Sequence, residues 1–277
     1  MDYREIPAPP PLSELVHCFW FLRGRLDGAG PQPIVADGRL EIILHLAEPF
    51  AQLDTSGRVR RQAEALVSGQ LTGPLHVTPS AHADVVGIRF RTDAAGTILR
   101  LPLRELTDRV DACAHLAPRL SDALLTAAAC STDPVTRVDA LSRALARFVW
   151  RSPDPMVRAA TRALGRSNAP RVGAVAGALG VSARTIERRV AEHTGLSPAS
   201  LRRVLRFRRS FRLLSELPSG AWARAAARAG YFDQAHLIRD FRQFAGVAPG
   251  EFFGADPDLA RAISASPEGD ASVQDAV

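Results

Sequence analysis

Arginine is the residue whose type and spacing in this chain could do chemistry. All 35 basic residues among the 277 are arginine, and Arg184, Arg188 and Arg239 lie in segments whose apolar residues recur at helical spacing. A guanidinium group holds several N–H donors in one plane, which fits the oxygens of a phosphate or carboxylate and the edge of guanine. The chemistry that these residues offer is recognition of anions and of base edges.

The positive charge is confined to one segment. Residues 166–253 contain 15 arginines and six acidic residues, a net charge of +9, whereas the whole chain carries +6, so the remainder sums to −3. A coding bias toward arginine would explain the absence of lysine but not this confinement. The distribution indicates that this segment alone meets a polyanion such as nucleic acid.

The three cysteines do not indicate a reactive centre. Cys18, Cys113 and Cys130 lack the CxxC or Cys/His spacing of a zinc site and are odd in number, so we expect small buried hydrophobic residues without a metal or disulfide. The chain has no Walker loop, no GxSxG and no HExxH. No cofactor is expected.

A second set of residues, of types that can bind a metal ion, lies in the N-terminal half. Asp37, Glu41 and His45 are spaced four apart and would serve as metal ligands only if they shared one face of an unbroken strand. The glycine after Asp37 instead favours a turn that leads into a strand. His76 and His82 lack the HxH pairing of a metal-binding β domain.

The elements that must position the arginines occur twice. The stretch 181–198 repeats as 231–249, each preceded by a short helical run. The matched positions are Gly180 and Gly230, Ser182 and Asp233, Gly195 and Gly246, and Pro198 and Pro249. The first pair suits a sharp turn with positive φ, and the second pair suits helix N-caps. Each unit is predicted to be a helix, a glycine turn and a capped helix, which is a helix-turn-helix.

The second helix of each unit has an apolar face and an outward face. The apolar residues are Ala183, Ile186 and Val190 in the first unit and Leu237, Phe241 and Phe244 in the second. The outward residues are Arg184 and Arg188 in the first and Ala235, Arg239 and Arg242 in the second. At 100° per residue one face anchors the helix and the other is free to contact a partner.

An arginine-rich helix is predicted to join the units, from about residue 199 to 214. Its apolar stripe is Leu201, Val204, Leu205 and Leu213. Its length of about 24 Å, with the width of the units, can set two reading helices about one 34 Å DNA turn apart. Phosphates would be neutralised by all or some of Arg202, Arg203, Arg206, Arg208, Arg209 and Arg212, with Arg203 and Arg209 as the representative contacts.

The first half of the chain is predicted to be a mostly antiparallel β domain followed by helices. Apolar, β-rich runs occupy 15–22, 39–46, 64–71 and 83–90, and helical spacing occupies 102–116, 119–129 and 135–150. The fold class is α+β, with domains at 1–150 and 154–254. The tail, 255–277, is small and polar and is predicted to be disordered.

The segment 156–253 resembles the DNA-binding domain of the AraC/XylS family of bacterial transcription regulators. The residues that carry the resemblance are Ala176, Gly180 and Ser182, the run Gly195-Leu196-Ser197-Pro198, Arg206, Leu213-Leu214, Gly230-Tyr231, Asp233, Phe241-Arg242 and Gly246-Val247-Ala248-Pro249. The resemblance implies that both second helices dock in the major groove of double-stranded DNA. It implies a first reading set of Arg184, Thr185, Glu187 and Arg188, and a second set of Gln234, His236 and Arg239. Ala235 and Ile238 stand where polar readers are common, so the second helix is expected to read fewer bases.

The N-terminal half is similar to regulatory domains found ahead of such modules, through ADGRLEIILHL at 36–46. This implies a small-molecule sensor, a homodimer surface, or both, and RNA polymerase as a further partner of an activator. The stripe Leu141, Leu145 and Phe148 would serve either as the dimer surface or as a cover for the β core. With no apolar run of membrane-spanning length and no signal peptide, we expect a cytoplasmic protein without a membrane partner.

One other class of function fits the sequence. AraC-type modules also position DNA for alkyl-transfer repair enzymes, but that chemistry requires a metal-activated cysteine cluster, which the cysteine spacing does not supply. Because the charge excess and both units follow Pro155, a fragment starting near Asp154 is expected to fold and bind the same DNA site.

Overall fold

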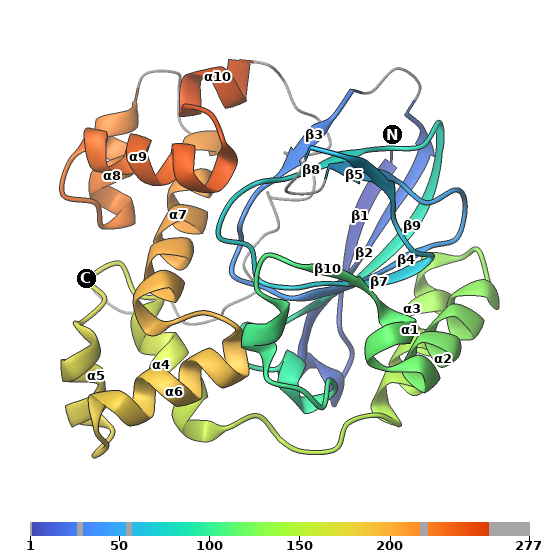
Figure 1. Cartoon of the computed structure of the whole chain (residues 1–277), viewed down its shortest axis with the longest axis horizontal. Coiled ribbons are helices and arrows are strands. Elements are labelled where there is room, and N and C mark those ends of the chain that lie inside the picture. The colour runs from blue at the N-terminus through green and yellow to red at the C-terminus, as the bar shows by residue number, and fades with distance from the viewer. Residues whose placement is uncertain (1, 27–29, 54–56, 217–220, 255–277) are drawn as a thin grey trace.

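The computed structural model describes residues 2–26, 30–53, 57–216 and 221–254. The predicted tail at 255–277 lies outside the described residues. A β-rich N-terminal half with its own helices stands beside a helical C-terminal half (Figure 1), which confirms the predicted α+β class. None of the described helices is long and apolar enough to cross a membrane.

The N-terminal half contains two antiparallel sheets. The larger has the order β1 (Asp2–Pro7), β2 (Val16–Arg25), β9 (His82–Phe90), β4 (Glu41–His45), β7 (Ala65–Ser68) and β10 (Val110–Ala112). The smaller has the order β3 (Gln32–Ile34), β8 (Leu75–Thr78), β5 (Ala51–Leu53) and β6 (Val59–Arg61). The four β-rich runs of the sequence form the four adjacent central strands β2, β9, β4 and β7.

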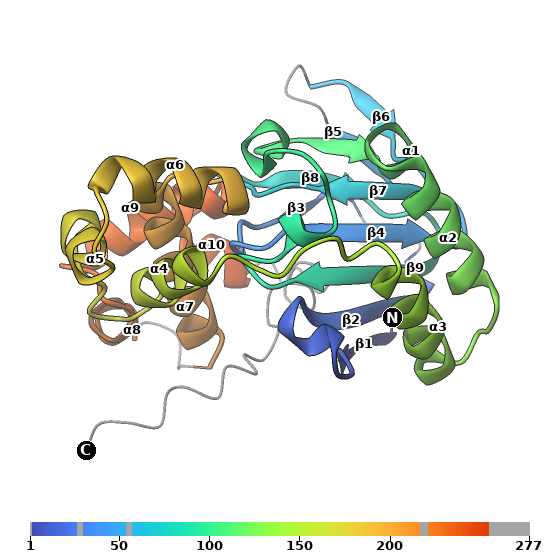
Figure 2. The ribbon, with the colours of Figure 1, turned by 90° about the horizontal axis from the view of Figure 1, so that it is seen from below.

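The larger sheet separates two apolar cores. On β4, Ile42 and Leu44 pack toward the helices, whereas Ile43 packs toward the smaller sheet. The helical cover consists of α1 (Cys113–Leu116), α2 (Pro118–Ala129) and α3 (Pro134–Ala146), which lie on the side of the β half away from the C-terminal helices (Figure 2). Leu141 and Leu145 are fully buried in this core, so the α3 stripe covers the sheet and is not an exposed dimer surface.

The prediction of a helix at 102–116 is wrong. This segment forms a short 3-10 helix, η3 (Leu103–Leu106), then β10, and only then the four-residue α1. β10 pairs with the edge of β7, and a free sheet edge gains hydrogen bonds from an added strand that helical periodicity cannot reveal. Two further 3-10 turns are η1 (Leu12–Glu14) and η2 (Ala95–Thr97).

The C-terminal half consists of seven helices in its described part. They are α4 (Pro155–Leu164), α5 (Val172–Ala178), α6 (Ala183–Thr194), α7 (Pro198–Glu216), α8 (Trp222–Ala229), α9 (Gln234–Ala245) and α10 (Pro249–Gly254). The α5–α6 and α8–α9 pairs lie at opposite ends of α7 (Figure 1). Stacked rings of Phe211 and Phe241, 6.0 Å apart, pack α7 against α9.

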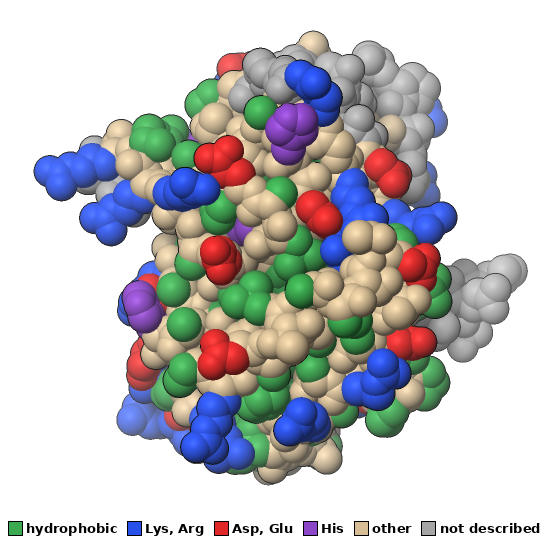
Figure 3. All heavy atoms as spheres, turned by 90° about the vertical axis from the view of Figure 1, so that its right-hand side faces the viewer, with side chains coloured by type: hydrophobic (Ala, Val, Ile, Leu, Met, Phe, Trp, Pro, Cys, Tyr) green, Lys and Arg blue, Asp and Glu red, His purple; other side chains and the backbone are tan. Residues whose placement is uncertain are grey.

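The outer face of the β half carries charges of both signs. Blue and red side chains are interspersed over it and do not gather into one region (Figure 3). This agrees with the net charge of −3 outside residues 166–253, since a surface of mixed sign does not attract a polyanion.

The two halves share part of a core. Val35 and Ala36, from the β half, are buried among the apolar residues of the C-terminal helices. Hydrogen bonds cross the same boundary: Thr107 Oγ1 donates to the Gly195 carbonyl at 2.5 Å, and Gln243 Nε2 donates to the Thr72 carbonyl at 2.9 Å. The second half therefore does not complete its core from its own residues.

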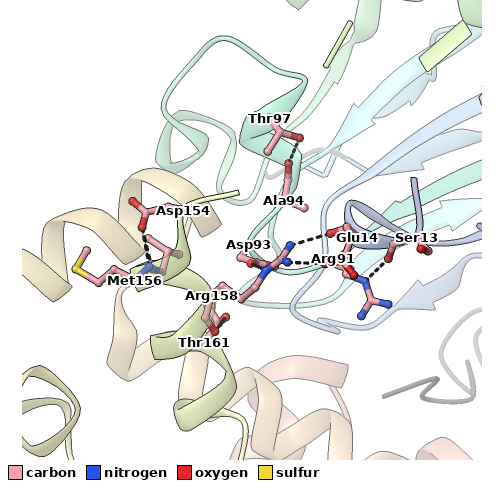
Figure 4. Close-up of polar contacts among 11 residues, drawn as sticks. Ser13, Glu14, Arg91, Asp93, Ala94, Thr97, Asp154, Met156, Arg158 and Thr161 are labelled. Carbon is pink, nitrogen blue, oxygen red and sulfur yellow. Dashed lines mark hydrogen bonds and ion pairs between the residues drawn. The ribbon is translucent and has the colours of Figure 1, made fainter. Parts of the chain in front are cut away.

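An arginine joins the start of the helical half to the β half. Arg158 on α4 contacts Asp93 through Nε at 2.9 Å and Glu14 through Nη1 at 2.6 Å (Figure 4). Asp154 caps the same helix by accepting from the backbone N–H groups of Met156 and Val157. The first turn of α4 is thus stabilised by its own N-cap and is also attached to the β half.

Candidate nucleic-acid interface

The first helix-turn-helix unit is built as its glycines and caps require. Gly180 turns the chain after α5 with φ of 66°, and the Ser182 side chain accepts the Thr185 N–H as the N-cap of α6. Gly195 ends α6 with φ of 87°, a left-handed conformation that favours glycine. Ile186 and Val190 are fully buried, which orients the helix.

The outward face of α6 carries most of the first predicted reading set. Arg184, Glu187 and Arg188 are exposed, and Arg188 reaches Glu192 at 3.3 Å. Thr185 is half-buried, and its hydroxyl bonds the Ser182 hydroxyl. Ala183, which we expected on the buried face, is exposed at the helix start. The face thus presents two guanidinium groups and a carboxylate, with Thr185 set back beside the cap.

The second unit repeats the geometry. Gly230 has φ of 84°, and a Cβ there would lie 2.3 Å from the Ser167 carbonyl oxygen, so only glycine fits. Asp233 caps α9 by accepting the His236 N–H at 2.6 Å. Gln234 and Arg239 are exposed at the surface. Phe232, just before the cap, is 94% exposed and was not singled out from the sequence.

A buried carboxylate fixes α9 to α7. Asp240 accepts from Arg203 Nη2 at 2.8 Å and from Arg206 Nη2 at 2.7 Å. Arg206 also contacts His236 at 2.9 Å, and burial together with Arg206 lowers the pKa of that histidine. His236, expected to read bases, is therefore half-buried and joined to this network.

Arg209 is also engaged within the protein. Its Nη1 donates to the Ala229 carbonyl at 2.8 Å, and its Nη2 donates to the Gly165 carbonyl. Arg203 remains 47% exposed while it contacts Asp240. The two arginines expected to contact phosphate thus differ: Arg203 keeps an exposed surface, whereas Arg209 holds α7 against the ends of α4 and α8.

A hollow with arginine walls opens between the units. It has a volume of about 320 Å³ and is lined by Arg166, Ser167, Asn168, Ala169, Arg202, Arg206, Arg209 and Gly230. Four guanidinium groups around one hollow create a positive potential that favours an anionic group. Neither Arg166 in this hollow nor Asp240 was predicted from the sequence to take part in the site.

A sequence signal existed for Asp240 but not for Arg166. Asp240 lies three residues after Leu237, at a position where the helical stripe requires a buried side chain, so an acidic residue there indicates a buried ion pair. Arg166 reaches the hollow only because the loop after α4 folds back onto Gly230, which no local pattern reveals.

Neither the cysteines nor the set Asp37, Glu41 and His45 shows a catalytic arrangement. Cys18 and Cys113 are buried as expected, whereas Cys130, also expected to be buried, is exposed at the end of α2. Burial raises the pKa of the Cys18 and Cys113 thiols to about 12 and about 11, so both stay protonated at neutral pH. Asp37 lies in a turn before β4, as expected from Gly38, which has φ of 78°. In the described part of the chain no three His, Cys, Asp or Glu side chains are grouped so that they could hold a metal ion.

Two family models match the chain. A model described as "Helix-turn-helix domain" matches residues 175–255, and "Domain of unknown function (DUF6597)" matches residues 4–111. No curated protein matches the chain.

Several solved structures are similar to the chain. The C-terminal domain of AraT, a response regulator from Geobacillus stearothermophilus, is 28% identical over 37% of this chain and 86% of that one, with a TM-score of 0.33. ToxT from Vibrio cholerae is 14% identical over 85% of this chain and 98% of that one, with a TM-score of 0.48. A probable AraC family regulator from Rhodopseudomonas palustris is 23% identical over 37% and 97%, with a TM-score of 0.33.

The fold and the helix-turn-helix match together define the class of this protein. Residues 175–255 match an AraC-type helix-turn-helix domain, and the α5–α6 and α8–α9 pairs are its two helix-turn-helix units. The protein is a DNA-binding transcription regulator with this domain behind a domain of unknown function.

Proposed function

We propose that the protein reads one DNA site through two successive major grooves, with α6 in one and α9 in the next. The observation that carries this proposal is the placement of two capped helices at opposite ends of α7, a helix of 19 residues. At 1.5 Å per residue α7 is about 28 Å long, close to the rise of about 34 Å per DNA turn.

The exposed residues divide into those proposed to contact bases and those proposed to contact backbone phosphates. Arg188 and Arg239 are the proposed guanine readers, since a guanidinium group can bond both acceptors of a guanine edge. Arg184, Glu187 and Gln234 stand beside them on the same outward faces. Thr185, beside the N-cap of α6, is also proposed to contact DNA. So is His236, which is joined through Arg206 to Asp240. The exposed ring of Phe232 suits an apolar contact with a sugar or a thymine methyl group.

The arginine-lined hollow is the proposed seat of a backbone phosphate between the two grooves. Arg202 and Arg166 contribute guanidinium groups from α7 and from the loop after α4. Arg203 remains a proposed phosphate contact because part of its side chain is exposed, and Arg209 supports the hollow from within. Contacts of this kind position the protein without reading sequence.

Footprinting on DNA selected from a random pool tests the proposal. We expect two protected stretches about 10 base pairs apart on one face of the duplex, and an affinity that falls steeply with salt. Arg188→Ala should weaken protection mainly in one stretch and Arg239→Ala mainly in the other, while Arg143→Ala on α3 serves as the matched control. A single protected stretch, or binding that is indifferent to salt, would contradict the proposal.

The N-terminal half is proposed to control this binding in response to a small molecule. Its mixed surface charge is unsuited to phosphate contact (Figure 3), and it packs against α7, which sets the distance between the reading helices. A ligand that changes this packing would change the affinity for DNA only to the extent that it binds the two arrangements unequally.

A further inference from the structure

A cavity lies between the two sheets of the N-terminal half. It has a volume of about 70 Å³, and apolar residues of both sheets make up most of its wall, among them Trp20, Leu22, Ile34, Ile43, Phe50 and Val77. Side chains alternate along a strand, so Glu41 and Ile43 of β4 point to the same side of the larger sheet. Both line the cavity, together with Arg39, which lies two residues before the strand, and Arg89 of β9. The wall is thus apolar with a few ionic groups at one segment.

The guanidinium group of Arg89, which also lines the cavity, has carboxylate partners within the protein. Arg89 is 1% exposed and contacts Glu5 at 2.9 Å, Asp37 at 3.8 Å and Glu41. Glu41 also accepts from the Trp20 indole N–H at 3.2 Å. Arg89 and Glu41 therefore satisfy each other and leave no strong demand for a ligand.

Arg39 is different. It is 9% exposed, and its backbone N–H bonds Asp37, but no acceptor in the described part of the chain lies within hydrogen-bonding or ion-pairing distance of its guanidinium group. Burial lowers its pKa to about 9, with Arg208 the strongest neighbouring charge, so it is still charged at neutral pH. The carboxylate of Asp37 is a favourable neighbouring charge but forms no ion pair with this group, and an anion from outside would offset the remaining cost of burial.

We propose that the cavity binds a small organic monoanion, a carboxylate on a compact apolar body, whose carboxylate pairs with Arg39. Arginine binds carboxylates through two parallel N–H donors, and the apolar wall accepts the rest of the molecule. A dry cavity of about 150 Å³ holds benzene. This cavity has about half that volume, so it suits a body of a few carbons without a ring. This inference rests on the proposed function, because it specifies the ligand that the N-terminal half senses.

The position of Arg39 connects the site to the DNA-binding half. The preceding residues touch α7: the Asp37 carbonyl accepts from Arg208 Nη1 at 3.2 Å, and a Cβ on Gly38 would lie 3.1 Å from Leu205. Arg208 and Arg39 repel each other across this contact. An anion at Arg39 offsets that repulsion and tightens the 35–38 segment against α7, which changes the relation between the two reading helices.

Calorimetry on the full-length protein without DNA tests the ligand class. The probes are propanoate and butanoate, each compared with its neutral counterpart, 1-propanol or 1-butanol. We expect the carboxylates to bind and the alcohols to bind about tenfold or more weakly, as fits loss of a charge-assisted hydrogen bond. Arg39→Gln should remove the preference for the carboxylate, Arg39→Lys should keep part of it, and Arg147→Gln on the exposed end of α3 is the control.

The proposal is overturned if the alcohols bind as well as the carboxylates, if no carboxylate binds at millimolar concentration, or if Arg39→Gln binds both carboxylates as the wild type does. Should Arg39→Gln fail to fold, the comparison of head groups on the wild type and on Arg39→Lys still decides. The calorimetry contains no DNA, so a failure of the proposed groove reading leaves its result intact. Addition of the binding carboxylate to a DNA titration should then change affinity at least severalfold, and no change would overturn the link to α7.

Discussion

Arg206 on α7 lies 2.7 Å from the carboxylate of Asp240 on α9, and this contact fixes the second reading helix. Asp240 is 2% exposed, and its other oxygen accepts from Arg203. The guanidinium group of Arg206 also stacks 4.3 Å over the Tyr231 ring. The orientation of α9 thus depends on one buried acidic residue in a segment that is otherwise basic.

Asp240→Asn is expected to destabilise the protein. Removing one partner of a buried ion pair costs about 3–5 kcal/mol, and we expect the lower end because Arg203 is half exposed. Chemical denaturation measures the change, with Asp139→Asn on the exposed face of α3 as the control. Equal stability of the two variants would show that α9 is held by its apolar face alone.

Base reading is expected to reside in Arg188 and Arg239. Replacing either by Ala should cost about 1–3 kcal/mol in binding and relax preference at one base pair. Selection of DNA sites by each variant measures this, and the relaxed positions should lie in different grooves. Loss of affinity by the same factor on every sequence would mean that these side chains hold phosphates and read nothing.

Arg202 and Arg209 both line the hollow, but their replacement by Ala is expected to affect different properties, DNA binding for Arg202 and stability for Arg209. Arg202→Ala should weaken binding to all sequences alike and reduce the slope of log affinity against log salt by about one, because one phosphate contact is lost. Arg209→Ala should lower the unfolding free energy, since two carbonyl groups lose their donor. Salt titrations and denaturation of both variants check the distinction, which fails if Arg209→Ala is as stable as the wild type.

Stability is expected to fall as the pH drops below about 6.5. Burial lowers the pKa of His45 from 6.5 to about 4 and that of His17 to about 3. Between 6.5 and 4 the unfolded chain binds protons that the folded chain excludes, so each histidine removes up to about 1.4 kcal/mol per pH unit. Above 6.5 both states are neutral at these residues, and the loss is absent.

His45→Gln tests this prediction in denaturation curves between pH 5 and 7. The variant should lose stability less steeply than the wild type as the pH falls, and exposed His82→Gln serves as the control. A slope that is unchanged in His45→Gln would place the proton uptake elsewhere.

A fragment of residues 154–277 is expected to bind the same DNA site but to be less stable than the helical half in the whole chain. It lacks Val35 and Ala36, which are buried in its core, and the carboxylates of Glu14 and Asp93 that hold Arg158. Denaturation of the fragment and site selection with it measure the two properties. A different selected site would show that the β half takes part in reading.

The sequence determined the features that depend on neighbours along the chain. Gly180, Gly230, Ser182 and Asp233 have local roles, a left-handed turn or a bond to an N–H three residues on, and all four behave as predicted. The apolar stripes of α7 and α9 and the four central strands followed from periodicity for the same reason.

Only the tertiary structure decided which charged groups are free. Arg203, Arg206 and Arg209 look alike in the sequence, yet Asp240 and the ends of α4 and α8, 20 to 44 residues away along the chain, determine their partners. The β edge that captured Val110–Ala112, the shared core at Val35 and the unpaired state of Arg39 likewise arise from contacts between distant segments. A local pattern specifies backbone conformation and the buried face of an element, whereas the partner of a long polar side chain is set by whatever the fold brings within its reach.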